Sequence, residues 1–186
     1  KEIEIMAEGG KKLARVKKIL KETVKPGISA MDIEDLANDL IKKEGAEASF
    51  KKVPGYSWAT CINLNSGLVH GIPKSDMVFK KGDVVSIDVG MFYRGFHTDT
   101  SITVAIEPDE GTQKFLSIGK RALSEAIAKA RVGNYIYNIS EVIETIIEAE
   151  SYSPIRALVG HGVGSELHEE PQIPCFLPGK VEESPK

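Results

Sequence analysis

The sequence predicts an α+β fold in which a pair of helices followed by antiparallel strands occurs twice. Three observations support this: apolar residues show helical spacing at the start of the chain, alternate with a period of two in its middle, and return to helical spacing later. The 186 residues are 41% hydrophobic and 27% charged, which suffices for a domain with a buried core. We therefore expect a single domain over residues 1–186, with a first half at about 1–108 and a second half at about 109–186.

Two helices are predicted at the start of the chain. Apolar residues recur at helical spacing over residues 3–20, and Pro26 ends this segment. Ser29 is followed three residues later by Asp32, a spacing that resembles a capping box. A second helix should therefore begin after Ser29 and continue to about Gly45.

Strands are predicted in the middle of the chain and helices again after it. The period shortens to two through TCINL, LVHGIP, DVVSIDVGMFY and HTDTSITVAI, with glycine and proline at the turns. Helical spacing returns at about residues 111–130 and 140–150. A short strand, RALVG, then leads into HGVGSELHEEP.

A shift of 106 residues places the second helix and its entry loop on a later helix. Under this shift Gly27 falls on Gly133, and Ile33 falls on Ile139, which indicates duplication of one structural unit. The hairpin predicted near residues 83–105 would have its counterpart beyond residue 186. We therefore expect the final strands of the second half to be missing from this chain.

Composition and charge argue against several classes of protein. The formal net charge is only -3, and the basic residues between Lys11 and Lys21 fit a solvated helix face better than a nucleic-acid surface. Cys61 and Cys175 occur in no disulfide or zinc spacing, which favours a reducing cytoplasm. No apolar run reaches the roughly 18 residues of a membrane span. We expect neither nucleic-acid recognition nor membrane association.

Asp88 and Asp99 are candidates for chemistry because they should share one face of a hairpin. A two-residue turn within residues 93–95 gives directly paired residues an odd separation, and these aspartates lie 11 residues apart. Their Cβ atoms would be about 4.5–5.5 Å apart if opposed and about 7–8 Å apart if diagonal. Three interpretations are open: a solvated or lysine-paired edge, a metal site with oxygen ligands, or an acid–base pair that shares a proton.

Histidines in glycine-rich or proline-rich contexts are further candidates. His161 lies in GHGVG, where the glycines permit close approach of a ligand, and His168 precedes two glutamates. His70 begins HGIP and, taken alone, fits a turn residue. Tyr56 and Cys61 fit either ordinary core or the lining of a pocket. No P-loop, GxSxG or cysteine-nucleophile motif competes with this site.

Together, the blocks VHGIP, IDVGMFYRGFHTDTS and GHGVGSELHEEPQIP resemble those of type I methionine aminopeptidases, and the similarity extends over essentially the whole chain. The resemblance implies the pita-bread fold, a pseudo-twofold arrangement of αα-β repeats with a curved antiparallel sheet. The implied metal ligands are Asp88, Asp99 and His161. The implied catalytic residues are His70 and His168. The implied substrate-binding residues are His70, Tyr56, Cys61, Leu167 and His168.

This resemblance implies a metal-dependent hydrolase that removes the N-terminal methionine from nascent proteins and peptides. The family site holds two divalent ions, of Co, Mn, Fe or Zn, with two glutamate ligands on strands beyond the HEEP block. We expect those strands to be missing from this chain, so it should hold one ion well or none, and it should be weak or inactive alone. The implied setting is the cytoplasm, with nascent N-termini and the ribosome as partners. We expect a monomer unless a second chain completes the site.

Two alternatives to this function remain open. An Xaa-Pro dipeptidase-like enzyme of the same fold shares the DVG, DTS and GHG elements, but it usually carries a preceding N-terminal domain. A non-catalytic pita-bread binding protein generally loses the aspartates and histidines that this sequence retains.

Overall fold

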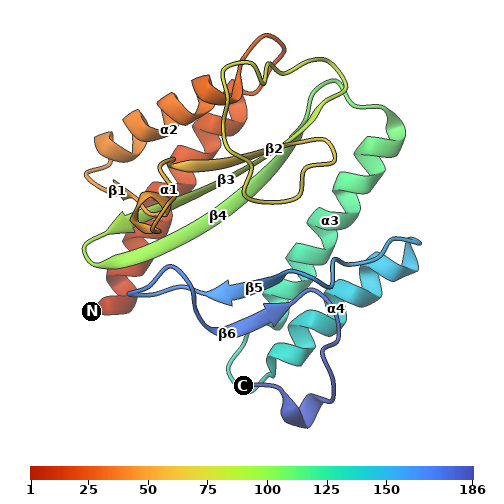
Figure 1. Ribbon diagram of the computed structural model, residues 1–186. Coiled ribbons are helices and arrows are strands. Elements are labelled where there is room, and N and C mark those ends of the chain that lie inside the picture. Colours follow the sequence, from red (N-terminus) through yellow and green to blue (C-terminus); the bar gives the residue numbers. More distant parts are fainter. The chain divides into compact units, whose positions relative to one another are not determined.

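The computed structural model describes residues 1–186, which form two compact units. The first unit comprises residues 1–109 and 163–167, and the second comprises residues 110–162 and 168–186. The helices are α1 (Glu2–Thr23), α2 (Ala30–Lys43), α3 (Glu110–Lys129) and α4 (Ile136–Ala149), with short 3-10 turns η1 (Phe50–Lys52) and η2 (Val181–Glu183) (Figure 1). The strands are β1 (Glu47–Ala48), β2 (Thr60–Leu64), β3 (Val84–Tyr93), β4 (Phe96–Ala105), β5 (Val159–Gly162) and β6 (Glu169–Pro174).

The sheet of the first unit is built around β3. Strand β4 pairs along one edge of β3, while β1 and β2 pair one after the other along its opposite edge, all antiparallel. Tyr93 pairs with Phe96, so Arg94 and Gly95 form a two-residue turn in which both residues have positive φ, 51° and 94°. Such turns match the twist of the strands they join. The predicted hairpin and the place of its turn are confirmed.

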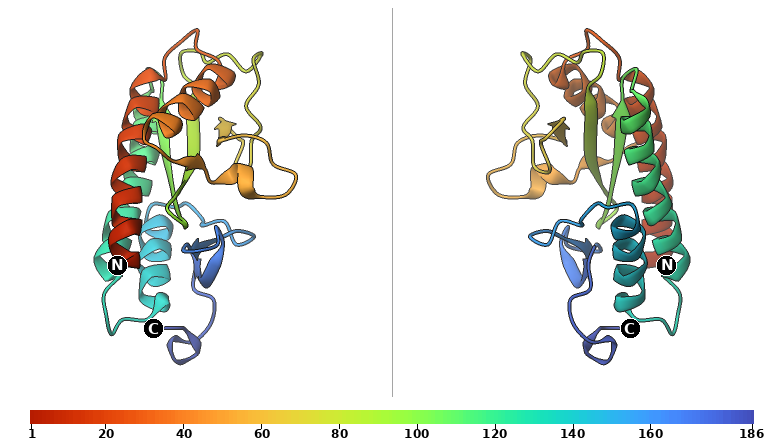
Figure 2. Two further views of the ribbon diagram at one scale, coloured as in Figure 1. Left: turned by 90° about the vertical axis from the view of Figure 1, so that its left-hand side faces the viewer. Right: turned by 90° about the vertical axis from the view of Figure 1, so that its right-hand side faces the viewer.

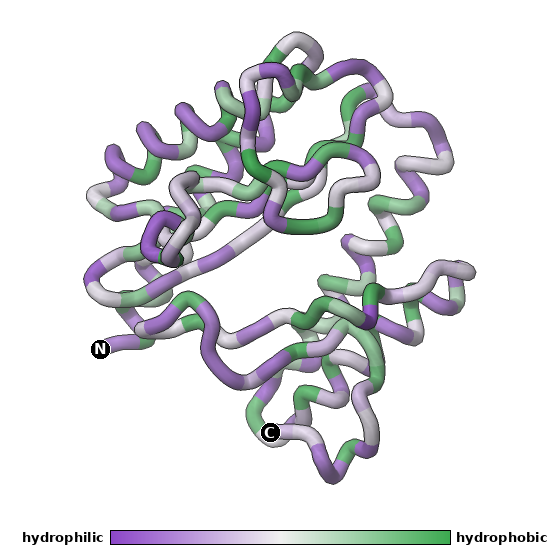
Figure 3. The backbone as a smooth tube through the Cα atoms, viewed as in Figure 1, coloured by the Kyte–Doolittle hydropathy of each residue, from purple (hydrophilic) through white to green (hydrophobic).

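One face of this sheet packs against α1 and α2. Figure 2 shows α1 on one side of the sheet and η1 on the other, and residues of α2 belong to the same core cluster as those of α1. The alternate residues of β3 that face the helices are fully buried, and each stabilises the fold by about 1.5–3 kcal/mol. The core residues are Leu13, Val16, Leu20, Ile33, Ala37, Ile41, Ile62, Val85, Ile87, Val89 and Met91. The alternation of hydrophilic and hydrophobic residues along α2, visible in Figure 3, follows from this packing.

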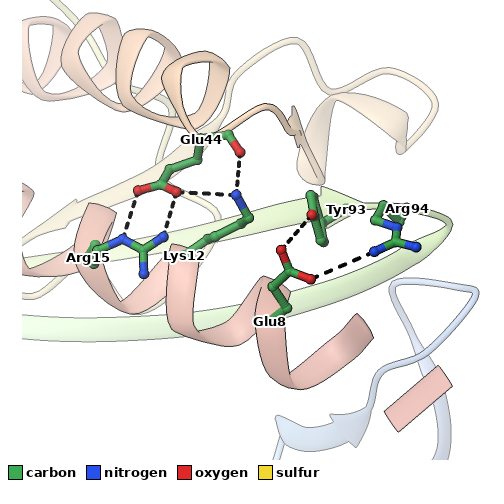
Figure 4. A network of polar contacts seen from close by, with 6 residues as sticks. All are labelled: Glu8, Lys12, Arg15, Glu44, Tyr93 and Arg94. Carbon is green, nitrogen blue, oxygen red and sulfur yellow. Dashed lines mark hydrogen bonds and ion pairs between the residues drawn. The ribbon is translucent and has the colours of Figure 1, made fainter. Parts of the chain in front are cut away.

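Charged side chains join α1 to the end of α2. Glu44, the C-terminal cap of α2, accepts hydrogen bonds from Arg15 at 2.9 and 2.7 Å, and its backbone carbonyl accepts one from Lys12 at 2.7 Å (Figure 4). The Arg15 hydrogen bond is the main reason that the pKa of Glu44 is lowered. Nearer the start of α1, Glu8 accepts a hydrogen bond from the Tyr93 hydroxyl at 2.7 Å. These contacts hold α1 against both α2 and the hairpin.

The second unit combines α3, α4 and the β5–β6 hairpin. Buried residues of α3 lie at helical spacing, and Ser140 of α4 donates a hydrogen bond of 2.7 Å to the carbonyl of Pro174. Strand β5 begins at Val159, three residues later than the strand start predicted from RALVG, and it includes His161. Strand β6 was not predicted, because a sequence with two glutamates and two prolines has low strand propensity.

The two units share the local structure that the 106-residue shift predicts. Helices α2 and α4 each have 14 residues, and their starts are 106 residues apart. The Ser29 N–H donates to the Asp32 carboxylate at 2.8 Å, and the Tyr135 N–H donates to Asn138 Oδ1 at 3.0 Å. The predicted helix start at residue 140 is therefore wrong, because the Asn138 side chain caps a helix that already begins at Ile136.

Candidate metal and substrate site

Asp88 and Asp99 share the sheet face that points away from α1 and α2. Asp88 pairs with Ser101, and Gly90 pairs with Asp99, so the two aspartates are diagonal neighbours. The prediction that both aspartates share one face is confirmed. Of the two arrangements considered, directly opposed or diagonal, the register shows the diagonal one. Gly90 lies between them in the register, where an added Cβ would lie 2.7 Å from the Phe50 ring. The chain therefore closes tightly over this part of the hairpin.

The environment of Asp88 makes its negative charge unfavourable. The pKa of Asp88 is raised from 3.8 to about 7, first by burial, then by the negative charge of Asp99 and by a hydrogen bond with it. The Val89 N–H opposes the shift. Because Asp99 Oδ1 is buried, a solvated edge hairpin does not describe this pair of carboxyl groups. The two remaining interpretations, a shared proton and a bound cation, both relieve the repulsion between the carboxylates.

This pair of carboxylates fits a divalent cation. Asp99 Oδ1 is buried, and carboxylate oxygens suit hard or borderline divalent ions. A cation at this place would relieve the repulsion that a proton otherwise relieves. Within either unit taken by itself, no group of three or more His, Cys, Asp or Glu side chains is placed to hold a metal ion.

An apolar cluster lies next to Asp88 on the same face. Phe50, Cys61 and Leu167 are buried together, and Tyr56 packs against them. Cys61 pairs directly with Asp88 across β2 and β3, so the cluster adjoins the carboxylates. The structure thus brings together Tyr56, Cys61 and Leu167, the three residues predicted to line a pocket.

The polar atoms of this cluster remain neutral at pH 7. The Tyr56 hydroxyl donates to the carbonyl of Thr60 at 2.8 Å and lies 3.1 Å from Cys61 Sγ. Burial is the main cause that raises the pKa of Cys61 to about 11, and it also raises the pKa of Tyr56. A neutral thiol and a neutral phenol beside apolar side chains suit an uncharged ligand.

His70 is held in a left-handed backbone conformation beside β2. It is exposed and has a φ of 54°, and the segment around it forms no strand, contrary to the alternation seen in LVHGIP. The Gly71 N–H donates to Asn63 Oδ1 at 3.0 Å, and the Gly71 carbonyl accepts from the Ile62 N–H at 2.8 Å. An added Cβ at Gly71 would lie 2.0 Å from the Ile62 carbonyl oxygen, so only glycine fits there.

His161 and His168 are neighbours within the second unit. Their ring centroids are 4.5 Å apart, and His161 Nδ1 lies 2.9 Å from the carbonyl of Gly162. When Nδ1 donates its hydrogen to that carbonyl, the lone pair resides on Nε2, as a metal-ligating imidazole requires. Of the predicted site residues, these two belong to the second unit and the others to the first.

Two buried polar residues near the site were not predicted. His97 Nδ1 is hydrogen-bonded to Ser49 Oγ, and the His97 N–H donates to the Gly164 carbonyl at 2.8 Å. Glu34 of α2 is only 3% exposed. The one signal for Glu34 in the sequence was an acidic residue next to Ile33, on the helix face that carries Ala37.

No helix in the structure is both long and apolar enough to cross a membrane.

The sequence is similar to known proteins over nearly its whole length. Residues 4–184 match the model of metallopeptidase family M24. The chain is 40% identical to methionine aminopeptidase 1 of Bacillus subtilis over 179 residues, covering 96% of this chain and 72% of that protein. It is 38% identical to the methionine aminopeptidase of Clostridium perfringens over 181 residues, with the same coverage of 96% and 72%.

Solved structures show the same fold. The methionine aminopeptidase of Thermotoga maritima has a TM-score of 0.91 and 38% identity, covering 94% of this chain and 71% of that chain. The prolidase of Pyrococcus furiosus has a TM-score of 0.80 and 26% identity, covering 94% of this chain and 51% of that chain. These similarities confirm the fold that the sequence predicts.

Proposed function

Because this chain belongs to metallopeptidase family M24, we propose that it is a methionine aminopeptidase, a hydrolase that removes the N-terminal methionine from nascent proteins and peptides. The observation that carries this proposal is the adjacency of Asp88 and Cys61, which places an apolar, uncharged cluster of side chains beside a pair of carboxylates. The pita-bread fold of the family agrees with the two similar units. Relatives named methionine aminopeptidase also match more closely than the prolidases do.

We propose Asp88, Asp99 and His161 as the metal ligands. The two carboxylates supply hard oxygen donors, and His161 supplies Nε2 in the tautomer set by its contact with Gly162. Divalent Co, Mn, Fe or Zn, when bound, supplies Lewis-acid polarisation of a carbonyl and lowers the pKa of water. With these three ligands we expect one ion to be held well at most.

The substrate side chain occupies the cluster formed by Tyr56, Cys61 and Leu167 in this proposal. These residues offer apolar surface and a neutral thiol, which suit the uncharged thioether of methionine. His70 and His168 are proposed as the catalytic histidines, which steady the substrate amide and the developing charge on its carbonyl oxygen. We also propose that the chain acts in the cytoplasm, on nascent chains at the ribosome.

Release of methionine from a Met-Gly-Met peptide tests this function. With three metal ligands the chain should be weakly active with Mn(II) or Co(II), yet it should release methionine faster than its Asp99→Asn variant, as measured by chromatography of the products. Asp99→Asn keeps the size of the side chain but removes a ligand charge. Release no faster than that of the variant would refute the proposal, and preferential cleavage of Xaa-Pro dipeptides would support the dipeptidase alternative.

A further inference from the structure

Glu34 is a buried carboxylate whose hydrogen-bond donors are all neutral. Its Oε1 accepts from the Ala59 N–H at 2.8 Å and from the side-chain amide of Asn38 at 2.7 Å. Its Oε2 accepts from both the N–H and the hydroxyl of Thr60, at 2.9 and 2.6 Å. Burial of a carboxylate is unfavourable unless such hydrogen bonds compensate for the lost water. The geometry of this segment is therefore tied closely to Glu34.

The segment that Glu34 holds is the start of β2. Thr60 is the first residue of the strand and pairs with Val89, and the Ala59 and Thr60 N–H groups would lack these acceptors if Glu34 were absent. The carbonyl of Thr60 accepts the hydrogen bond from the Tyr56 hydroxyl at 2.8 Å. Cys61 is the next residue, so one anchored peptide fixes both polar members of the apolar cluster.

We propose that Glu34 is a positioning residue for substrate specificity, which holds Ala59 and Thr60 so that Tyr56 and Cys61 form a pocket selective for the methionine side chain. This inference rests on the proposed function of the cluster. Glu34 lies on the helix side of the sheet and acts through the backbone of β2. Its negative charge adds to burial in raising the pKa of Tyr56 and of Cys61, which helps to keep both groups neutral.

A purely structural role for Glu34, as a link between helix and sheet, predicts a different result. Such a role would lower stability without changing the pocket selectively. Glu44 provides a matched control, because it is the C-terminal cap of the same helix but contacts Lys12 and Arg15 of α1. The variants Glu34→Gln and Glu44→Gln both keep side-chain volume while removing one carboxylate.

Two readouts report on the segment without any ligand. Trp58 is the only tryptophan of the chain, and its ring lies 5.4 Å from that of Tyr56, so its fluorescence reports on this segment directly. Cys61 is buried, and its rate of alkylation by iodoacetamide can be followed by mass spectrometry of its own peptide. In the Glu34→Gln variant, iodoacetamide should alkylate Cys61 about tenfold faster than in the wild type, and the Trp58 emission should shift. In the Glu44→Gln variant, both the alkylation rate and the emission should be unchanged. Equal alkylation rates in the wild type and Glu34→Gln would overturn the proposal.

Peptide turnover tests the effect on specificity. Glu34→Gln should raise KM for a methionyl peptide roughly tenfold with kcat nearly unchanged, and it should reduce the preference for methionine over leucine at the N-terminus. An unchanged methionine-to-leucine preference would overturn the inference while leaving the proposed function intact. Absence of turnover by the wild type would refute the proposed function instead, and alkylation would still decide whether Glu34 positions the pocket.

A milder pair of variants covers the case in which Glu34→Gln does not fold. Thr60→Val removes only the hydroxyl donor to Glu34, whereas Thr60→Ser retains it. Thr60→Val should show faster Cys61 alkylation than Thr60→Ser, with both variants folded by circular dichroism. Equal rates for this pair would count against the proposal.

Discussion

At the scale of single residues, Asp88 sets a balance between stability and metal binding. Its burial beside Asp99 is unfavourable for folding when both groups are charged. The same arrangement creates a strong preference for a cation. Asp88 is thus expected both to destabilise the metal-free protein and to make the site selective for a cation.

We predict that Asp88→Asn stabilises the metal-free protein at alkaline pH. The pKa of Asp88 is raised to about 7 in the folded chain, so between about pH 4 and pH 7 the folded state binds more protons than the unfolded state. The free energy of unfolding of the wild type should therefore fall as pH rises through this window. At pH 8 the variant should be more stable by roughly 2 kcal/mol. Urea unfolding with a chelator at pH 5 and pH 8 measures this.

Metal titration of the same variant gives the opposite expectation. Asp88→Asn should bind Mn(II) much more weakly than the wild type in calorimetry, because a ligand charge is lost. A variant that binds Mn(II) as tightly as the wild type would exclude Asp88 as a ligand.

Gly71→Ala should displace the segment that carries His70. The new Cβ would lie 2.0 Å from the Ile62 carbonyl oxygen, which is backbone and cannot rotate away. Overpacking of this kind costs about 1–3 kcal/mol, and misplacement of His70 should lower kcat/KM at least tenfold. The control is Gly10→Ala, which meets no atom within 4 Å in the middle of α1 and should stabilise the chain slightly. Equal activity of the two variants would contradict this account.

At the scale of elements, each unit contains a helix whose first turn is capped by side-chain hydrogen bonds. The side chains of Ser29 and Asp32 exchange hydrogen bonds with the backbone at the start of α2, and these bonds lower the pKa of Asp32. A lowered carboxyl pKa stabilises the fold at neutral pH, and this contribution is lost as pH falls below the usual aspartate range. At the start of α4, Asn138 accepts the N–H of Tyr135.

Removal of either cap should affect its own unit. Ser29→Ala should destabilise the first unit by about 1 kcal/mol, and Asn138→Ala should destabilise the second by a similar amount. Hydrogen exchange measured by mass spectrometry should show faster exchange in α2 for Ser29→Ala and in α4 for Asn138→Ala. Uniformly faster exchange over both units in each variant would show instead that they unfold as one cooperative body.

At the scale of the whole molecule, two units with related helix pairs account for the similarity to family M24. The shift of 106 residues was detectable in the sequence because helix starts and turn glycines depend on local interactions. The hairpin of the first unit was also predictable, since a two-residue turn determines which residues of its strands share a face.

The sequence by itself determined the helices, the β3–β4 hairpin and the shared face of Asp88 and Asp99, because each depends on residue spacing within one or two elements. Only the tertiary structure revealed that Glu34 anchors the start of β2, 26 residues away, and that His97 contacts Ser49, 48 residues away. Such pairs leave no periodic pattern. They form because buried polar groups must find partners once apolar packing has brought distant segments together.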